Sequence, residues 1–311
     1  MRRSRSEFAG GSSPPQAAKC VRTNSRILHS IFGAGQSKTE VDGSIPSAPK
    51  IMPSYNVKLL SKKEVAFGTM AFELEKPAGF EFRPGQFVEI VFDDVQTDPR
   101  GREREFSIAS SPNEPNILIA TRIRDSGFKK VLGDLPLGSV VKMEGPFGSF
   151  TLPNDISRPV VILTGGIGIT PFRSMVKYAA EAKLLHKIFL FYANRRPEDA
   201  AFLQELYELS PYGRSLMPSA DLPKGSVEGR QLTTNNFKFI ATMTKPELSK
   251  QSWKGETGYI NMEMIKKYVD NIAAPIYYIA GPPAMVQAMW QMLKSAGVSD
   301  ESIRTEEFVG Y

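Results

Sequence analysis

Residues 159–183 place an apolar strand, a glycine-rich turn and a helix in immediate succession, and this order constrains the fold most strongly. The apolar run at 159–162 leads into LTGGIGITP at 163–171, and a helical pattern follows from Phe172 to Lys183. Glycines let a backbone approach a ligand closely, and a helix N-terminus presents backbone N–H groups to a phosphate. The succession predicts a nucleotide-phosphate site in an α/β sheet; the alternative is a tight turn with no ligand.

The rest of the C-terminal half repeats this alternation of buried strands and helices. Strands are expected at 160–163, 188–192, 240–243 and 276–279, and helices at 172–182, 198–209, 262–269 and 284–295. Such alternation is typical of a doubly wound parallel sheet, in which ligands bind beyond the carboxyl ends of the strands. Residues 210–233 lack periodicity and are predicted to form a long loop.

Residues 54–150 instead show short alternating strands separated by turns. The expected strands are 55–60, 70–74, 87–92, 105–109, 117–123 and 140–144, with one helix at 127–135. Pro84 and Gly85 supply a turn between two of these strands. Six short strands of this kind predict a small antiparallel barrel of Greek-key type.

The first 53 residues are rich in Ser, Gly, Pro, Arg and Lys and lack periodicity, so we expect disorder there. The composition also suits a transit peptide, or a non-native leader with Met52 as the true start. We therefore expect a disordered extension at 1–53, a barrel domain at 54–150 and an α/β domain at 151–311. A chain of 311 residues is long enough for roughly two folded domains.

The net charge of +6 belongs almost entirely to the N-terminal extension. Residues 1–50 carry eight Lys and Arg against three Asp and Glu, so the remaining residues are close to neutral and predict no nucleic-acid partner. With only Cys20, His29 and His186 available, neither an iron–sulfur cluster nor another metal site is expected. No apolar run approaches the roughly 18 residues of a membrane span, and the low cysteine content suits a reducing, cytoplasmic compartment.

The segment REFSIAS at 104–110 combines a cation, an aromatic ring and hydroxyls on one expected strand. Arg104 and Phe106 are two residues apart, so strand alternation places them on one face. An arginine suits a phosphate, an aromatic ring suits stacking on a planar ring system, and Ser107 can hydrogen-bond a ring nitrogen. The alternative is an ordinary strand with one surface arginine.

Two further segments have the composition of phosphate-binding turns. RIRDSGFKK at 122–130 combines Gly127 at a helix start with two lysines, and its alternative is a solvated basic turn. AGPPAM at 280–285 follows a buried strand and precedes a helix, and its alternative is a helix start fixed by proline. This turn and the turn at 165–171 both follow parallel strands, so we expect them to line one crevice.

Taken in order, these segments resemble the ferredoxin–NADP reductase superfamily. Six patterns carry the resemblance: FEFRPGQF at 80–87, R-x-F-S at 104–107, GPFGSF at 145–150, GGIGITP at 165–171, GPP at 281–283 and EEF at 306–308. The first is similar to a strand-turn signature of the family, the second to its flavin motif and the third to its domain junction. The other three resemble two nucleotide loops and the closing motif. The resemblance spans 54–311 and includes no iron–sulfur domain.

The resemblance implies that FAD, rather than FMN, binds on the barrel and that NADPH or NADH enters between the domains. Hydride would pass from nicotinamide C4 to flavin N5, with Arg104 on the FAD phosphates, Phe106 packed on the isoalloxazine and Ser107 near N5. The residues implied to act in catalysis are Ser107, Thr170, Glu306 and Phe308. The residues implied to bind cofactors are Arg104, Phe106, Ser107, Ile108, Ala109, Ser110, Thr121, Arg122, Gly127, Phe128, Lys129, Lys130, Gly165, Gly166, Gly168, Thr170, Pro171, Asn194, Arg195, Arg196, Gly281, Pro282, Pro283, Met285 and Tyr311.

Three positions depart from the family pattern or leave a choice open. Ala280 stands where relatives often have a cysteine near the nicotinamide, which predicts slower hydride transfer. Lys130 replaces the usual Ser or Thr of the pyrophosphate turn. The aromatic that shields the flavin is expected to be Phe308 by motif, with Tyr311 at the chain end as the alternative.

The preference between NADPH and NADH is expected to depend on Asn194, Arg195 and Arg196, which follow the second strand of the α/β domain. Two arginines suit a 2′-phosphate, and this predicts a modest preference for NADPH. The alternative is that both arginines are solvated loop residues.

The expected function is therefore that of a flavin-dependent NAD(P)H oxidoreductase that passes electrons to a carrier such as ferredoxin or flavodoxin. One group of alternatives comprises a reductase of free flavin or ferric chelates and the reductase component of an oxygenase. The other is a non-catalytic nucleotide-binding regulatory module, for which Ala280 and Lys130 are the main arguments.

Overall fold

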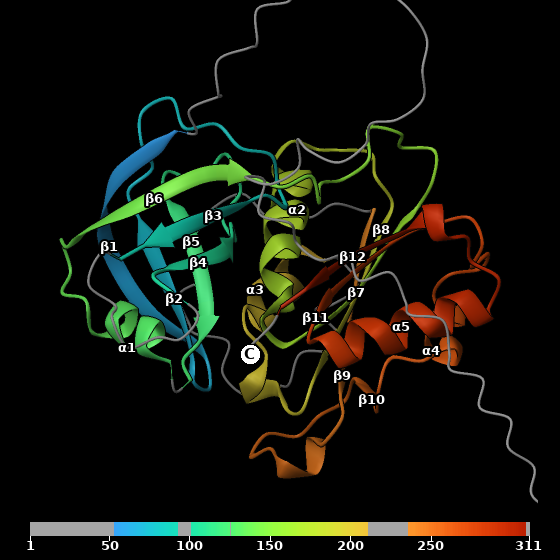
Figure 1. The fold of residues 1–311 in the computed structure, drawn as a ribbon. Coiled ribbons are helices and arrows are strands. Elements are labelled where there is room, and N and C mark those ends of the chain that lie inside the picture. The colour runs from blue at the N-terminus through green and yellow to red at the C-terminus, as the bar shows by residue number, and fades with distance from the viewer. Residues whose placement is uncertain (1–52, 93–100, 125, 211–235, 309–311) are drawn as a thin grey trace, which may run out of the picture. The chain divides into compact units, whose positions relative to one another are not determined.

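The computed structural model describes residues 53–92, 101–124, 126–210 and 236–308 (Figure 1). Three expectations concern residues outside these ranges: the disorder of nearly all of the extension at 1–53, most of the loop at 210–233, and the role of Tyr311. The described residues form two six-stranded sheets.

The first sheet is antiparallel throughout, in the order β4-β3-β6-β1-β2-β5. Its strands are β1 (Ser54–Ala66), β2 (Thr69–Leu74), β3 (Phe87–Val91), β4 (Glu103–Ser107), β5 (Ile117–Arg122) and β6 (Val140–Phe147), and helix α1 (Gly127–Asp134) lies between β5 and β6 in the chain. The two edge strands approach each other just beyond β4, where Ala109 donates its backbone N–H to the Leu118 carbonyl at 2.7 Å. The predicted antiparallel barrel is confirmed.

Strand alternation builds the barrel interior. Val57 and Leu59 of β1 are buried in one apolar cluster with Phe72 and Leu74 of β2, because residues two apart in a strand share a face. Strand β1 runs beyond its expected range of 55–60 because its first half pairs with β6 and its second half with β2. Each half thus satisfies its backbone hydrogen bonds against a different neighbour.

The second sheet is parallel throughout, in the order β10-β9-β8-β7-β11-β12. Its strands are β7 (Val160–Gly165), β8 (Ile188–Asn194), β9 (Phe237–Met243), β10 (Glu256–Thr257), β11 (Ile276–Gly281) and β12 (Ile303–Glu307). The chain moves outward from β7 to β8 and β9, then returns to the other side of β7 as β11. This reversal puts the topological switch point between β7 and β11, where open parallel sheets bind ligands.

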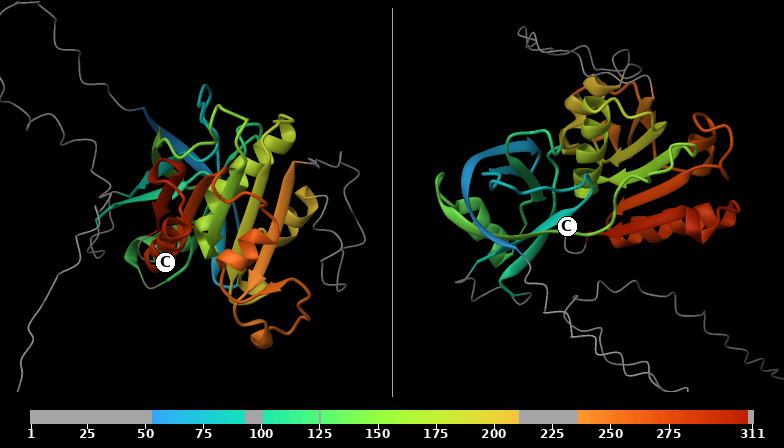
Figure 2. Two further views of the ribbon diagram at one scale, coloured as in Figure 1. Left: turned by 90° about the vertical axis from the view of Figure 1, so that its right-hand side faces the viewer. Right: turned by 90° about the horizontal axis from the view of Figure 1, so that it is seen from above.

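Helices cover both faces of the parallel sheet, as Figures 1 and 2 show. The helices are α2 (Thr170–Glu181), α3 (Leu203–Leu209), α4 (Met262–Lys266) and α5 (Pro283–Ser295). Helices α2 and α3 pack on one face with Val160 and Ile162 of β7, whereas α4 and α5 pack on the other face with Val161 and Leu163. Because every residue of β7 is buried, its first four residues, 160–163, are continuously apolar rather than alternating. The predicted doubly wound sheet is confirmed.

Several boundaries differ from those expected. The helix expected over 198–209 is broken, since a short 3₁₀ turn covers Pro197–Asp199 and α3 begins only after Phe202, whose φ of 59° is left-handed. Helix α4 ends at Lys266 rather than at residue 269. Strands β10 and β12 were not expected, because β10 has two residues and β12 is a largely polar edge strand without alternation.

Candidate functional site

The glycine turn after β7 forms the 3₁₀ helix Gly166–Ile169, and α2 continues directly from it with Pro171 in its first turn. A Cβ atom at Gly168 would overlap the Ala280 carbonyl group and would come within 2.9 Å of the Gly281 Cα atom. Glycine is therefore required at position 168, because only a residue without a side chain lets this turn contact the end of β11.

The turn after β11 meets the first turn at the switch point. Thr164 donates its hydroxyl hydrogen to the Ala280 carbonyl oxygen at 2.8 Å, and Met285 of α5 lies against Gly165, where a Cβ atom would be 2.7 Å from the Met285 sulfur. Pro282 and Pro283 then begin α5. The structure thus brings together the two turns that the sequence placed at one crevice.

The closing motif at 306–308 contacts the turn after β11, because it lies at the end of the neighbouring strand β12. Glu306 pairs with Ala280 in the sheet, and Phe308 donates its backbone N–H to the Gly281 carbonyl at 2.9 Å. The Phe308 side chain is buried in the apolar cluster under α2 and α3. The core of the α/β half thus covers most of the ring that the motif implied to shield the flavin.

On the barrel, Arg104 and Phe106 lie on one face of β4, as predicted. Both contact Phe128 of α1: the Arg104 guanidinium is 5.1 Å from the Phe128 ring centroid, and the Phe106 ring centroid is 6.1 Å from it. Phe106 is only 3% exposed and belongs to the barrel core. Its ring therefore does not present the expected open stacking surface, because Phe128 and the barrel interior cover it.

The N-terminus of α1 is capped by Ser126, whose hydroxyl oxygen accepts the Lys129 backbone N–H at 3.4 Å. Gly127 follows at the first helical position. The sequence expected two lysines to add charge here, but Lys129 is buried and only Lys130 is exposed. The eight-residue helix turns position 129 inward beside Phe128 and Leu132, so one lysine rather than two faces solvent.

Ser107 and Thr170, the two hydroxyls expected at the reacting ring atoms, are both buried. Ser107 pairs with Phe87 at the end of β4, and the buried residues Ile108, Ala109 and Ser110 follow it. The Thr170 hydroxyl donates to the Ile167 carbonyl at 3.1 Å at the start of α2. Each hydroxyl thus lies at the end of a well-packed element.

The glycine turn after β7 also packs directly on the barrel. Ile167 forms a small buried cluster with Ala71 of β2 and Ala120 of β5, two strands on the barrel's surface. The alanines leave room for the turn to approach the sheet closely. This contact places the glycine turn of one sheet against the strands of the other.

A cluster of arginines lies beyond the carboxyl end of β8. Arg195 and Arg196 approach the buried Asp199 carboxylate at 3.1 and 3.3 Å, and Arg122 of the barrel approaches it at 3.8 Å. Burial and the nearby Arg195 charge lower the pKa of Arg122. The Lys245 backbone N–H donates to the Arg195 carbonyl at 2.8 Å, which places residue 245 next to Arg195 in the chain's fold. The sequence reasoning missed Asp199 and Lys245.

Comparison with known proteins identifies the type of fold. Residues 162–219 and 224–291 match the family described as the oxidoreductase NAD-binding domain. A ferredoxin NADP+ reductase from Neisseria gonorrhoeae with bound FAD and NADP superimposes with a TM-score of 0.63 at 19% identity, covering 82% of this chain and 98% of that one. The flavohem-like FAD/NAD-binding domain of a Vibrio cholerae nitric oxide dioxygenase gives 0.62 at 18% identity, covering 81% and 98%.

The chain has the ferredoxin–NADP reductase fold. The resemblance predicted from the six sequence patterns is thereby confirmed.

Curated relatives of this reductase-like chain are longer than the segment they share with it. The reductase component of propane 2-monooxygenase from Rhodococcus jostii is 26% identical over 240 residues, covering 75% of this chain and 57% of that protein. A component of the Na(+)-translocating NADH-quinone reductase from Methylococcus capsulatus is 27% identical over 294 residues, covering 80% and 67%. The match to these relatives therefore spans between about half and two thirds of their length.

Within the reductase fold, the residues present fit a flavin and a nicotinamide nucleotide. The Thr121 hydroxyl on β5 is fully buried and has no hydrogen-bond partner among the described residues, so it is available to a polar ligand group. Gly168 lets the glycine turn lie directly against the Ala280 carbonyl, which keeps the two turns at the switch point together. In the described ranges, no three His, Cys, Asp or Glu side chains are placed to hold a metal ion, and no helix is long and apolar enough to cross a membrane.

Proposed function

We propose that this chain is a flavin-dependent NAD(P)H oxidoreductase. The observation that carries the proposal is the contact between the two sheets: Ile167 of the glycine turn packs on Ala71 and Ala120 of the barrel. A nucleotide held at that turn would lie beside the barrel that carries the R-x-F-S motif. FAD, when bound, supplies a hydride acceptor at N5 and passes electrons onward.

The barrel offers the groups that FAD would need. Arg104 presents a guanidinium for the phosphates, and the α1 N-terminus at Gly127 offers backbone N–H groups with Lys130 nearby. Ser107 and Thr121 offer hydroxyls for polar groups of the ring and chain. For Phe106 to stack on the isoalloxazine, Phe128 must withdraw from its present contact with that ring.

The α/β half offers the groups that the nicotinamide nucleotide would need. The turn at Gly165–Gly168 would hold the pyrophosphate, and Gly281, Pro282 and Pro283 would bind the nucleotide from the neighbouring strand end. Thr170, Glu306 and Phe308 each contact one of these two turns, and the nicotinamide ring is proposed to enter beside them. We propose that 54–150 binds the flavin and that 151–311 binds the nicotinamide nucleotide.

Arg195, Arg196 and Lys245 are proposed to recognise the adenosine 2′-phosphate, which favours NADPH over NADH. Asp199 holds both guanidinium groups beside each other, so their fork-shaped donor sets already lie at one site. Because the same carboxylate neutralises part of their charge, the preference is expected to be modest.

A separate protein is proposed as the electron acceptor, such as a ferredoxin or flavodoxin. The second candidate is a reductase component of an oxygenase, which is favoured by the likeness to the propane 2-monooxygenase and glycine betaine monooxygenase reductases. We also propose a cytoplasmic location, on the low cysteine content alone.

An anaerobic visible spectrum tests the proposal. The purified protein is expected to show flavin bands that bleach on addition of NADPH, and more slowly with NADH. Bands that persist with both nucleotides would mean that the nicotinamide has no access to the flavin. A colourless protein that neither FAD nor FMN reconstitutes would instead favour the nucleotide-binding regulatory module.

A further inference from the structure

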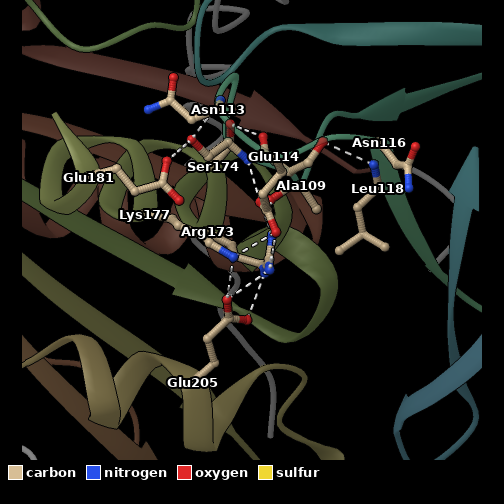
Figure 3. Close-up of polar contacts among 12 residues, drawn as sticks. Ala109, Asn113, Glu114, Asn116, Leu118, Arg173, Ser174, Lys177, Glu181 and Glu205 are labelled. Carbon is tan, nitrogen blue, oxygen red and sulfur yellow. Dashed lines mark hydrogen bonds and ion pairs between the residues drawn. The ribbon is translucent and has the colours of Figure 1, made fainter. Parts of the chain in front are cut away.

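A polar stripe runs along the face of α2 that meets the barrel (Figure 3). Arg173, Ser174, Lys177 and Glu181 follow Thr170 by 3, 4, 7 and 11 residues, so they share one side of the helix with Thr170 at its start. Each of these four contacts the segment at 109–114, which follows the R-x-F-S motif.

Arg173 is the centre of this stripe and is only 5% exposed. Its Nε and Nη2 donate to the Glu205 carboxylate of α3 at 2.8 and 2.7 Å. Its Nη1 and Nη2 donate to the Glu114 carboxylate at 3.1 and 3.2 Å, and Nη1 also donates to the Ala109 carbonyl at 2.6 Å. All five N–H donors of the guanidinium are therefore used, three of them on the barrel segment.

Two neighbouring side chains of α2 also connect this helix to the barrel segment at 109–114. Ser174 donates its hydroxyl hydrogen to the Ser110 carbonyl at 2.6 Å, and the Lys177 ammonium donates to Glu114 at 2.6 Å. Glu114 is in turn held by the Ser111 backbone N–H at 2.6 Å. Although burial alone would raise it, the hydrogen bond and charge of Arg173 lower the pKa of Glu114, so the carboxylate stays ionised.

The position of the network in the chain gives it a consequence for the reaction. Ala109, which accepts from Arg173, is two residues after Ser107. Arg173 itself is one helical turn after Thr170. One buried side chain therefore joins the end of the flavin motif to the start of the helix that follows the nucleotide turn.

We propose that Arg173 is a positioning residue that sets the placement of the nicotinamide relative to the flavin. The proposal rests on the function proposed above. Glu114 and Glu205 fix the guanidinium from two sides, and the Ala109 carbonyl fixes the flavin motif to it. Loss of this clamp would let the two rings separate without removing a group that touches either ring. Misplacement of reacting atoms by about 1 Å costs about 100-fold in rate.

The test is Arg173→Lys, studied by anaerobic stopped-flow reduction of the bound flavin with NADPH and with NADPH deuterated at C4. Lysine keeps the charge but cannot donate to two carboxylates and a carbonyl in the fork geometry. We expect the reduction rate constant to fall by about 10- to 100-fold and the deuterium isotope effect to persist. The flavin content and the NADPH dissociation constant are expected to stay within about threefold, since neither site loses a contact.

Arg158→Lys is the matched control. Arg158 also donates to backbone carbonyls, at Ala274 and Pro275, and to Ser302, but all three partners lie within the α/β half. This variant is expected to lose stability without slowing flavin reduction in the fraction that retains flavin. Equal reduction rate constants in the Arg173→Lys, Arg158→Lys and wild-type proteins would overturn the proposal.

Ser174→Ala tests the same inter-sheet connection if Arg173→Lys fails to fold, because Ser174 is the second residue of α2 that holds the segment after the flavin motif. It removes only the hydrogen bond to the Ser110 carbonyl and is expected to slow reduction by about threefold to tenfold, whereas an unchanged rate constant would overturn the proposal. A wild-type protein whose bound flavin neither nucleotide bleaches would refute the proposed function itself, and the inference with it. Bleaching in the wild type with no change in the variants refutes the inference alone.

Discussion

The Arg195 guanidinium lies 3.1 Å from the buried carboxylate of Asp199, at the end of the strand where the adenosine ribose would bind. Arg195 is the more exposed of the two arginines on this carboxylate, with a side chain 56% exposed against 26% for Arg196. It is therefore the arginine that a ligand from solvent reaches most readily.

Arg195→Ala is expected to raise the KM for NADPH by about tenfold, because it removes a charge-assisted contact to the 2′-phosphate. The KM for NADH, which lacks that phosphate, should change little. Lys187→Ala is the control, since Lys187 immediately precedes β8 and so lies at the opposite end of the same strand. Steady-state kinetics with both nucleotides measure the effect. An unchanged KM for NADPH would refute the proposed role of Arg195 in recognising the 2′-phosphate.

Gly168→Ala is expected to push the glycine turn away from the end of β11, because the new Cβ would overlap the Ala280 carbonyl. Both partners are backbone groups of adjacent buried strands and turns, so relief requires the turn to shift. We expect a loss of about 1–3 kcal/mol in the free energy of unfolding and at least a tenfold weaker nucleotide affinity.

Gly133→Ala provides the contrast within the same chain. Gly133 lies in α1 with open space where its Cβ would point. Alanine there is expected to stabilise the protein by about 0.5–1 kcal/mol. Thermal unfolding and nucleotide titration of both variants measure the two effects, and equal behaviour would contradict the close approach at Gly168.

Glu89 on β3 makes stability depend on pH. Burial, followed by the charges of Glu103, Glu105 and Glu144, raises the pKa of Glu89 to about 7 from 4.5. The folded protein therefore binds a proton at Glu89 more tightly than the unfolded chain does. Stability should fall as pH rises from 4.5 to 7 and then stay lower, because the ionised carboxylate is disfavoured in the fold.

Glu89→Gln should therefore raise the free energy of unfolding by about 1 kcal/mol at pH 8, after allowance for solvent screening, and by almost nothing at pH 4. Denaturant titrations at the two pH values measure this difference. Glu81→Gln, at an exposed barrel position, is the control and should lack the pH-dependent gain. A Glu89→Gln gain of equal size at both pH values would contradict the raised pKa.

Lys62 is expected to stabilise α1, the helix whose N-terminus we propose as the binding site of the flavin phosphates. Its ammonium donates to the carbonyls of Gly133 and Leu135 at 2.7 and 2.8 Å, at the C-terminal end of α1. Lys62→Met keeps the aliphatic stem but removes both bonds, and should cost about 1–2 kcal/mol and weaken flavin retention. Lys63→Met, at the exposed neighbouring position, should do neither; equal flavin loss in both variants would rule out the capping role.

Local patterns in the sequence were sufficient to predict both the antiparallel and the parallel sheet. Residues 160–163 are continuously apolar because helices cover β7 on both faces, and Val57 and Leu59 flank the exposed Lys58 because only one face of the first half of β1 is buried. Each pattern reflects which side chains of one strand are buried, so it can be recognised within a short window of residues. The turn at Gly168 was also predictable, because a glycine-rich connection between a strand and a helix is a local feature of the sequence.

The tertiary structure alone decided which side chains meet across the two sheets. Arg173 and Glu114 are 59 residues apart and neither belongs to a local motif, yet they form the buried centre of the inter-sheet network. The left-handed Phe202, whose ring lies 5.0 Å from the Arg173 guanidinium, breaks a helix that its own sequence favours. Such a conformation costs about 1–2 kcal/mol and persists where long-range contacts offset it. The sequence by itself thus determined the two sheets and the two turns that follow β7 and β11. The burial of Phe106, the pairing of Asp199 with Arg122 and the Arg173 clamp depend instead on contacts between segments that only the folded chain brings together.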